Sequence, residues 1–172
     1  MHDLNTSQLN ITIRPATLVD LDTILIIFNH AIKHTTAVYS YDPYTPEMML
    51  EWFQEKRNNN FPVYVSIAGE NVTGFVTYGT FRIRPAYKFS MEHSIYVHHN
   101  HRQKGIAKAL MKLILAEAKK ANVHTLIGGI DAENEISIAF HKKFGFEKVA
   151  HIKEAGYKFD RWLDLVFMQK ML

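Results

Sequence analysis

The sequence predicts a single domain of the α/β (α+β) class, and three observations support this. The apolar spacing along the 172 residues alternates between a period of two, typical of strands, and a period of about 3.6, typical of helices. No repeat, low-complexity tract or linker divides the chain. Hydrophobic residues make up 47% of it, enough to close one sizeable core. We therefore expect one domain over residues 1–172, with residues 1–10 as a flexible N-terminal segment.

The first half is predicted to hold a strand, two helices and a hairpin. After a strand at residues 11–14, Thr17 and Asp20 have the spacing of a capping box and open a helix. Its apolar stripe comprises Leu21, Ile24, Leu25, Phe28 and Ile32. Thr45 and Pro46 start a second helix that runs to about residue 57. Segments 63–68 and 72–81, separated by Gly69-Glu-Asn71, predict a hairpin.

The second half alternates strands and helices. A helix at residues 105–121 places its apolar stripe inward and its lysines toward water. A short helix over residues 135–144 ends at Gly145. The remaining strands are predicted at residues 91–97, 125–130, 146–153 and 162–170.

Composition narrows the possible functions. The chain has no cysteine, which excludes disulfides, thiolate metal sites and cysteine nucleophiles and makes the reducing cytosol the natural compartment. No signal peptide precedes the domain and no apolar run approaches the roughly 20 residues of a membrane span, so we expect a cytoplasmic protein without membrane contact. With 20 basic and 17 acidic residues, the charge is too balanced to indicate nucleic-acid binding.

One segment carries an anion-binding signal. The predicted strand of residues 91–97 runs into the basic turn Arg102-x-x-Gly105-x-Ala107, which opens the long helix. The N–H groups of residues 103–107 are unpaired donors of a first helical turn, and the helix dipole adds positive charge there. Gly105 permits close approach to the backbone. The turn is therefore suited to a pyrophosphate, although an ordinary helix start could show the same short pattern.

This turn resembles the Q/R-x-x-G-x-G/A signature of the GNAT acetyltransferases, where it holds the pyrophosphate of acetyl-CoA. The predicted order β-α-α-β-β-β-α-β-α-β-β is similar to that of the GNAT fold. The resemblance implies a mixed central sheet of about seven strands flanked by about four helices. It also implies acetyl-CoA as co-substrate, held by Arg102, Gln103, Lys104, Gly105, Ile106 and Ala107.

More specifically, the chain resembles the phosphinothricin and methionine sulfoximine N-acetyltransferase subfamily from Ile13 to its C-terminus. The shared blocks are Ile13-Arg-Pro-Ala16, Thr35-Thr-Ala37, Tyr78 to Tyr87, Glu92-His-Ser-Ile-Tyr-Val97, Gly129 to Asn134 and Lys158 to Gln169. The resemblance implies a homodimer. We expect its interface to include the loops beside the acceptor site and the apolar segment Leu163 to Met168, which would otherwise form an exposed edge strand.

Glu92 is the expected general base. N-acetylation needs a neutral amine, so the ammonium group of an amino acid must first lose a proton. Similar enzymes use a glutamate at this position, directly or through water, and apolar neighbours would raise its pKa. The alternative is a solvent-facing glutamate that pairs with Arg82 or Arg84.

The residues after Glu92 alternate between the two faces of the strand. His93 should point to the opposite face and be packed or hydrogen-bonded, whereas Ser94 and Tyr96 share the Glu92 face and could line the acceptor site. By resemblance, the strand is splayed here, and its backbone at Tyr96 and Val97 pairs with the pantetheine amides and polarises the thioester.

Asn134, Ser137 and His141 lie in a second segment that resembles a GNAT cofactor region. The resemblance implies contacts of Asn134 and Ser137 with the cofactor, but Asn134 could equally be a helix N-cap. His141 stands where GNAT enzymes often carry a tyrosine that protonates the departing thiolate. It could be this general acid or only a hydrogen-bonding partner of the cofactor.

Arg82, Arg84 and Tyr87 are the expected acceptor-binding residues. Arginines spaced by two share one side of an extended segment, and guanidinium groups match carboxylate, phosphinate or sulfoximine oxygens. Lys158 and Trp162 could close the pocket from the end of the chain. The alternative is a solvated basic loop.

Histidines 98, 99 and 101 invite a metal-site hypothesis, but adjacent loop histidines lack the fixed spacing of known metal motifs. We expect no metal there and a solvated turn near the cofactor phosphates instead.

The sequence therefore predicts an acetyl-CoA-dependent N-acetyltransferase. Its expected acceptor is the α-amino group of phosphinothricin, methionine sulfoximine or methionine sulfone, attacked directly in a ternary complex because no cysteine can form an acyl-enzyme. The alternatives are another amine acceptor, such as a different amino acid, a polyamine or a protein N-terminus, and a non-catalytic acyl-CoA sensor.

Overall fold

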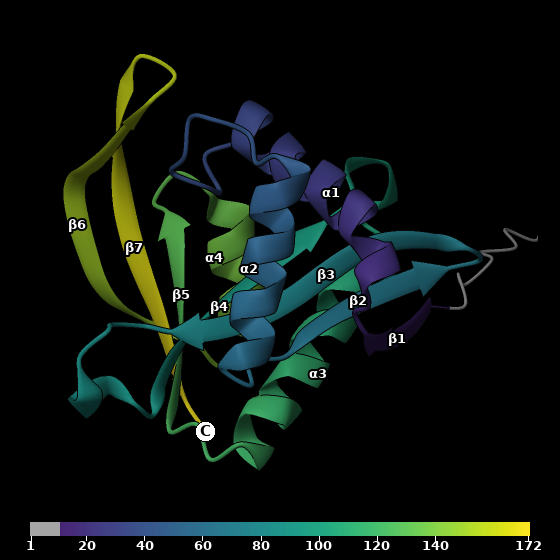
Figure 1. Ribbon diagram of the computed structural model, residues 1–172. Helices are drawn as coiled ribbons and strands as arrows, with labels where there is room; N and C mark the ends of the chain where they lie inside the picture. The colour runs from purple at the N-terminus through teal and green to yellow at the C-terminus, as the bar shows by residue number, and fades with distance from the viewer. Residues whose placement is uncertain (1–10) are drawn as a thin grey trace, which may run out of the picture.

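The computed structural model describes residues 11–172, so the expectation for residues 1–10 lies outside the described residues. The chain forms one seven-stranded sheet in the order β1-β2-β3-β4-β5-β7-β6, with helices on both faces (Figure 1). The strands are β1 Ile11–Pro15, β2 Val63–Ala68, β3 Asn71–Thr80, β4 Ser90–Val97, β5 Thr125–Asp131, β6 Glu147–Lys158 and β7 Arg161–Met171. The helices are α1 Leu21–His34, α2 Pro46–Asn58, α3 Ile106–Lys120 and α4 Glu135–Lys143. Short 3₁₀ turns lie at Leu18–Asp20 before α1, at Pro85–Tyr87 between β3 and β4, and at His99–His101 before α3. The predicted fold class is confirmed.

Alternation along β3 divides the core between the two faces of the sheet. Phe75 points toward α1 and α2, and the next residue, Val76, packs with α3 on the other face. The α3 side also contains Leu110, Ile114 and Met168, all fully buried. The two apolar layers hold the central strands rigidly while their ends remain available for a site.

Local signals set several helix ends as predicted. The Thr45 side chain accepts a hydrogen bond from the Met48 N–H, and Pro46 is the first residue of α2. At the start of the chain, the Asp20 carboxylate accepts hydrogen bonds from the Thr17 backbone and hydroxyl and pairs with Arg14 at 2.7 Å. A short 3₁₀ turn therefore precedes α1.

The last strand is not at the edge of the sheet, and this part of the prediction is wrong. β7 lies between β5 and β6 and pairs antiparallel with both. The β6–β7 hairpin folds back so that β6 becomes the edge (Figure 1). Leu163, Val166 and Met168 are buried within the single chain, so the segment does not need a second copy to cover an exposed edge.

Lys158 ties the hairpin to the opposite side of the molecule. It is 3% exposed, and its Nζ donates to the backbone oxygens of Ile32, Thr35 and Val38 at 2.6, 2.9 and 2.7 Å. These carbonyls lie at and just after the end of α1, where a helix leaves acceptors unpaired. All three N–H donors of the ammonium group are thus used within the fold.

Replacement of Lys158 by Met should therefore lower the free energy of unfolding by about 2–3 kcal/mol, because three carbonyls lose a charged donor. Urea unfolding measures this directly. Lys148→Met, at an exposed position of the same strand, is the control and should change stability by less than about 0.5 kcal/mol. Equal stability of the two variants would contradict the assigned role.

Candidate functional site

The parallel strands β4 and β5 separate in the middle of the sheet. They pair only over Ser90–Glu92 and Thr125–Ile127, although β4 continues to Val97 and β5 to Asp131. The remaining residues of β4 still pair with β3 on their other side. A cleft with free backbone groups therefore opens directly after Glu92, as the resemblance implied for residues 96 and 97.

The basic turn stands at the far end of β4 and presents a run of unpaired donors. Gly105 is the N-cap of α3, with φ of +79°, and Gln103 also has a positive φ of +62°. The first helical bond runs from the Ala109 N–H to the Gly105 carbonyl. Within residues 11–172, the N–H groups of residues 102–108 have no acceptor. Together with the dipole of a 15-residue helix, they make this turn suited to an anion.

The side chains of this turn divide between solvent and core. Arg102, Gln103 and Lys104 are exposed, and Lys104 donates to the Asn100 carbonyl. Ile106 is 1% exposed and packs in the core, so only its backbone can serve a ligand. The anion site is therefore made mainly of backbone, with cationic side chains around it.

Glu92 lies partly buried at the point where the strands separate. It is aligned with Gly79 of β3 and Ile127 of β5. A Cβ placed on Gly129 would come within 3.0 Å of its Oε1, so this glycine leaves room for the carboxyl. Burial raises the pKa of Glu92, and the positive charges of Arg82 and Lys56 partly oppose that rise. In residues 11–172 the carboxylate makes no ion pair within 4 Å, so the alternative of a direct pair with Arg82 or Arg84 is not what the structure has.

A cavity of about 140 Å³ lies between α2 and the face of the sheet that carries Phe75 of β3 and Tyr96 of β4. Ser94 and Tyr96 line it, as their alternation with Glu92 predicted. The other lining residues are Phe28, Tyr44, Met49, Trp52, Lys56, Phe75 and Thr77. The walls are thus largely aromatic, with one cationic side chain.

Lys56 joins this cavity to Glu92, and the sequence reasoning missed it. Its Nζ donates to the Tyr78 carbonyl at 3.1 Å and would lie 2.7 Å from a Cβ on Gly79, the residue opposite Glu92. Burial lowers the pKa of Lys56, while the charges of Glu55 and Glu92 act against this. The available signal was the stripe of Met49, Trp52 and Lys56 on one face of α2.

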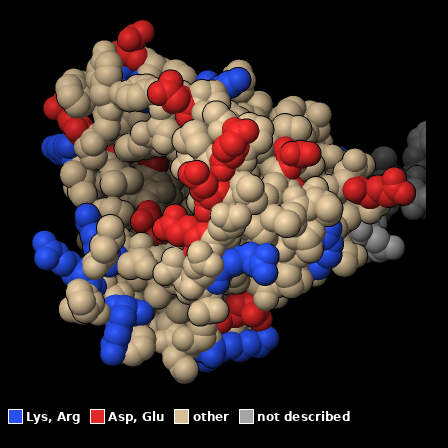
Figure 2. All heavy atoms as spheres, in the orientation of Figure 1, with Lys and Arg blue, Asp and Glu red and all other residues tan. Residues whose placement is uncertain are grey.

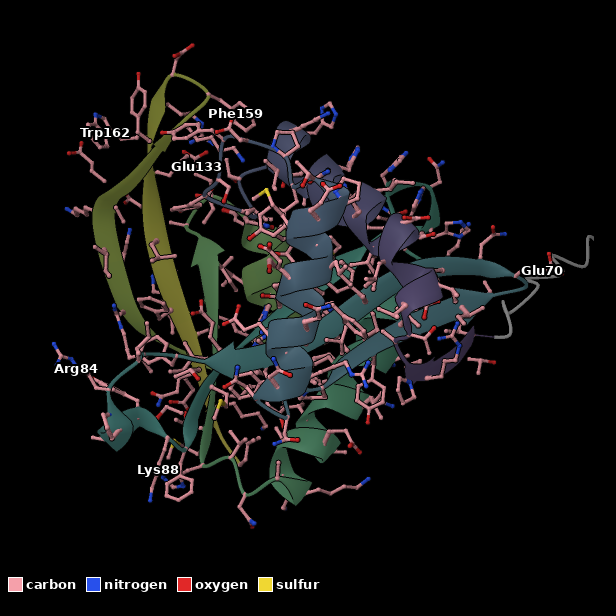
Figure 3. The ribbon with its side chains drawn as sticks, in the orientation of Figure 1. Glu70, Arg84, Lys88, Glu133, Phe159 and Trp162 are labelled. Carbon is pink, nitrogen blue, oxygen red and sulfur yellow. The ribbon has the colours of Figure 1, made fainter. Side chains whose placement is uncertain are left out.

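The loop after β3 forms a basic rim around this region. Arg82, Arg84 and Tyr87 are exposed, and Arg84 points away from the protein (Figure 3). The Arg82 guanidinium lies over the Phe81 ring, 5.2 Å from its centroid. Figure 2 shows a hollow on this face, with acidic atoms inside it and basic side chains along one rim. Of the two arginines, Arg82 is the one whose charge reaches Glu92.

A second and larger hollow, of about 480 Å³, contains none of the predicted site residues. It lies near the Glu70 turn labelled in Figure 3, and Arg14, Glu70, His98 and His101 are among its lining residues. The part of the chain that the structure describes contains no group of three or more His, Asp or Glu residues arranged to hold a metal. None of its helices is long and apolar enough to cross a membrane.

Helix α4 brings three predicted residues together. The Asn134 side chain accepts from the Ser137 N–H at 3.0 Å, so its role as N-cap is present. His141 is 7% exposed; its Nδ1 lies 2.7 Å from the Ser137 carbonyl and 3.5 Å from the Ser137 hydroxyl. Its Nε2 lies 3.0 Å from Nε2 of His93.

His93 is buried on the opposite face of β4 from Glu92, and its predicted packing is confirmed. Its Nδ1 donates to the Ile127 carbonyl at 2.8 Å, at the point where β4 and β5 separate. Burial lowers the pKa of both His93 and His141, and a charge on His141 lowers that of His93 further.

Lys158 does not belong to this site, and its prediction as an acceptor-binding residue is corrected. Its ammonium group is fully engaged by three backbone carbonyls, so it has no donor left for a substrate. Trp162, at the same hairpin, is 59% exposed on the outer surface (Figure 3).

The separated strands, the donor-rich turn and the partly buried carboxylate together fit an acyl-transfer site. The model of the acetyltransferase (GNAT) domain matches residues 13–167, and the chain belongs to this family. It is 36% identical, over 94% of its length and 94% of the relative, to the L-methionine sulfoximine/L-methionine sulfone acetyltransferase of Salmonella typhimurium strain LT2.

Two solved structures show the same fold with related activities in their descriptions. One is a phosphinothricin acetyltransferase from Sinorhizobium meliloti in complex with acetyl-CoA, with 33% identity, a TM-score of 0.91 and coverage of 94% of this chain and 88% of that one. The other is a ribosomal-protein-alanine N-acetyltransferase from Brucella melitensis, with 40% identity, a TM-score of 0.92 and coverage of 94% and 99%. The protein is therefore an N-acetyltransferase of the GNAT family.

Proposed function

We propose that this acetyltransferase transfers the acetyl group of acetyl-CoA to the α-amino group of a small polar amino-acid analogue. The acceptors are methionine sulfoximine, methionine sulfone and phosphinothricin. The main support is the position of Glu92, a partly buried carboxylate at the mouth of the cleft between β4 and β5. The names of the similar proteins support the substrate class.

The residues of the cleft fit acetyl-CoA. The unpaired N–H groups of residues 102–108 would hold the pyrophosphate, with Arg102, Gln103 and Lys104 around it. The free edge of β4 at Tyr96 and Val97 would pair with pantetheine, and Asn134 and Ser137 lie on the helix across the cleft. Bound there, acetyl-CoA supplies an activated acyl group.

Replacement of Gly105 by Ala should weaken acetyl-CoA binding. No atom would contact the new Cβ within the protein, but the φ of +79° is strained for alanine by about 1 kcal/mol, and relaxation would move the N–H groups of the anion site. Titration calorimetry should show affinity about tenfold lower.

The matched control is Gly69→Ala, at a turn with φ of +63° and equally open surroundings. It should cost similar stability and leave acetyl-CoA affinity unchanged. Equal affinity of the two folded variants would remove the proposed anion site.

Glu92 is the proposed general base. As a carboxylate it can take a proton from the substrate ammonium group, directly or through one water. Burial raises its pKa, which strengthens it as a base but requires a higher pH for its deprotonation. Activity should therefore decline as pH falls through this raised pKa.

Replacement of Glu92 by Gln should lower kcat by about 10²–10⁴ and remove the acidic limb of the pH profile, because an amide cannot accept the proton. Acetyl-CoA affinity should barely change. Retention of near wild-type kcat would assign the base to another group.

The aromatic cavity and the basic rim are the proposed acceptor site. Ser94 and Tyr96 would line it, Lys56 and Arg82 would attract the anionic groups of the amino acid, and Arg84 with Tyr87 would lie at the entrance. An aromatic lining suits the methylene and methyl groups that these acceptors carry.

A panel of amines separates this proposal from the alternatives. Thiol release from acetyl-CoA should be fast with methionine sulfoximine, methionine sulfone or phosphinothricin, and slow with polyamines or peptide N-termini. Release with peptides alone would favour a protein N-terminus as acceptor, and absence of release with every amine would favour an acyl-CoA sensor.

Within the panel, Arg82→Ala and Arg84→Ala form a matched pair. Because the charge of Arg82, and not that of Arg84, acts on Glu92, the loss of Arg82 should raise KM several-fold. It should also raise the pKa of Glu92 and so move the acidic limb of kcat to higher pH. Arg84→Ala should leave that limb in place.

We also propose a homodimer in the cytoplasm. The single chain exposes Ile83 almost fully, and Phe89, Phe159 and Trp162 are more than half exposed. Ile83 and Phe89 lie in the segment between β3 and β4, whereas Phe159 and Trp162 lie at the turn of the β6–β7 hairpin. A second copy would cover these side chains. Light scattering of the full chain at micromolar concentration measures this. The absence of cysteine suits a reducing compartment.

A further inference from the structure

A buried pair of imidazoles on the α4 side of β4 has more hydrogen bonds than two neutral rings can supply. His93 and His141 are 6% and 7% exposed, and their Nε2 atoms lie 3.0 Å apart. Nδ1 of His93 faces the Ile127 carbonyl at 2.8 Å, and Nδ1 of His141 faces the Ser137 carbonyl at 2.7 Å.

The three hydrogen bonds of this pair need more protons than two neutral imidazoles carry. A carbonyl oxygen only accepts, so each Nδ1 must carry a hydrogen. The contact between the two Nε2 atoms requires one further hydrogen, which gives three for two rings. A neutral pair has only two, so one of the three contacts would set lone pairs against each other in a buried place. Burial lowers the pKa of His93 to about 3 and also lowers the pKa of His141, and repulsion between the rings disfavours charge on both at once. An extra proton is therefore held only if the hydrogen bond between the two Nε2 atoms and the two carbonyl contacts offset this cost.

We propose that His93 and His141 share one extra proton between their Nε2 atoms, and that His93 is the positioning residue that keeps His141 protonated for the leaving thiolate. This rests on the proposed acetyl transfer. Because His93 holds the Nε2 proton, the proton that can leave His141 is the one on Nδ1, on the side of the Ser137 hydroxyl.

Acetyl transfer removes two protons from the ammonium nitrogen and delivers one to the sulfur. Glu92 first takes the ammonium proton and passes it to water. The neutral nitrogen then bonds to the thioester carbonyl carbon, the carbon–sulfur bond breaks, and the nitrogen loses a second proton to Glu92. The thiolate takes a proton from the Ser137 hydroxyl, which is replaced from Nδ1 of His141. The pair then regains one proton from water, and Glu92 releases its own.

The surroundings leave this proton without a carboxylate partner. Glu92 points to the other face of the strand, and the charges that act on the two rings are chiefly their own. The rings Phe140 and Phe146 pack against the pair. The other titratable groups on the packed elements are Glu135, Lys142 and Lys143, exposed on α4; Asp131, near Arg161 at the far end of β5; and Lys170 of β7, beside Gly145.

Nitrogen-15 NMR of the full chain without cofactor tests the proton count. At neutral pH, three of the four ring nitrogens of His93 and His141 should be protonated, with signals assigned through His93→Gln and His141→Asn. Two protonated nitrogens would overturn the proposal. This count needs no turnover, so it decides the question even if the chain acetylates none of the proposed amino acids.

The pH profile of kcat tests the role of His93. His93→Phe removes the acceptor for the Nε2 proton, so His141 should deprotonate more easily and the alkaline limb should move down by about one pH unit or more. His93→Gln, whose amide oxygen can accept that proton, should restore most of the shift. His124→Gln, at an exposed position, is the control for the loss of one imidazole. An alkaline limb unchanged in folded His93→Phe would overturn the positioning role.

Discussion

The early separation of two parallel strands determines the rest of the site. β4 and β5 pair for three residues and then diverge, although both are interior strands of the sheet. Unpaired buried backbone groups cost about 1–3 kcal/mol each, so such a gap persists only where other partners are offered. His93 supplies one partner at the apex by donating to the Ile127 carbonyl. The free edge of β4 and the N–H groups before α3 then form one continuous polar lining, suited to a ligand that carries amides and a pyrophosphate.

Glycines on either side of Glu92 make the same gap chemically useful. Gly79 lies opposite it on β3, and Gly129 lies beyond its partner Ile127 on β5. Any side chain at these positions would meet the Lys56 ammonium group at 2.7 Å or the Glu92 carboxylate at 3.0 Å. Because these two positions of the sheet carry no side chain, a carboxylate and an ammonium group can both be partly buried against it. Burial raises the pKa of Glu92 and lowers the pKa of Lys56, so each group gives up its charge more easily than it would in water.

The sequence predicted the elements well because their signals are local. The capping residues Thr17 and Thr45, and the periodicity of α3, fixed helix positions to within a few residues. It could not place β7 inside the sheet, because the choice between edge and interior depends on how the hairpin folds back. Lys158 was misassigned for a similar reason: its acceptors lie more than 100 residues away, and sequence alone shows only an exposed-type residue. The cavity lining of α2 and the contact of His93 with His141 are likewise products of tertiary packing.

Alternation along β4 also separates the proposed acid from the proposed base. Glu92 and His93 are neighbours in sequence, but their side chains leave opposite faces of the strand. If both shared one face, a carboxylate and a protonated imidazole would form an ion pair, which would lower the pKa of the first and raise that of the second. Such a pair would weaken Glu92 as a base and the imidazole as an acid. The strand backbone prevents this pairing. In the proposed mechanism, Glu92 therefore accepts a proton from the nitrogen on one face of β4, and the imidazole pair supplies a proton toward the sulfur on the other face.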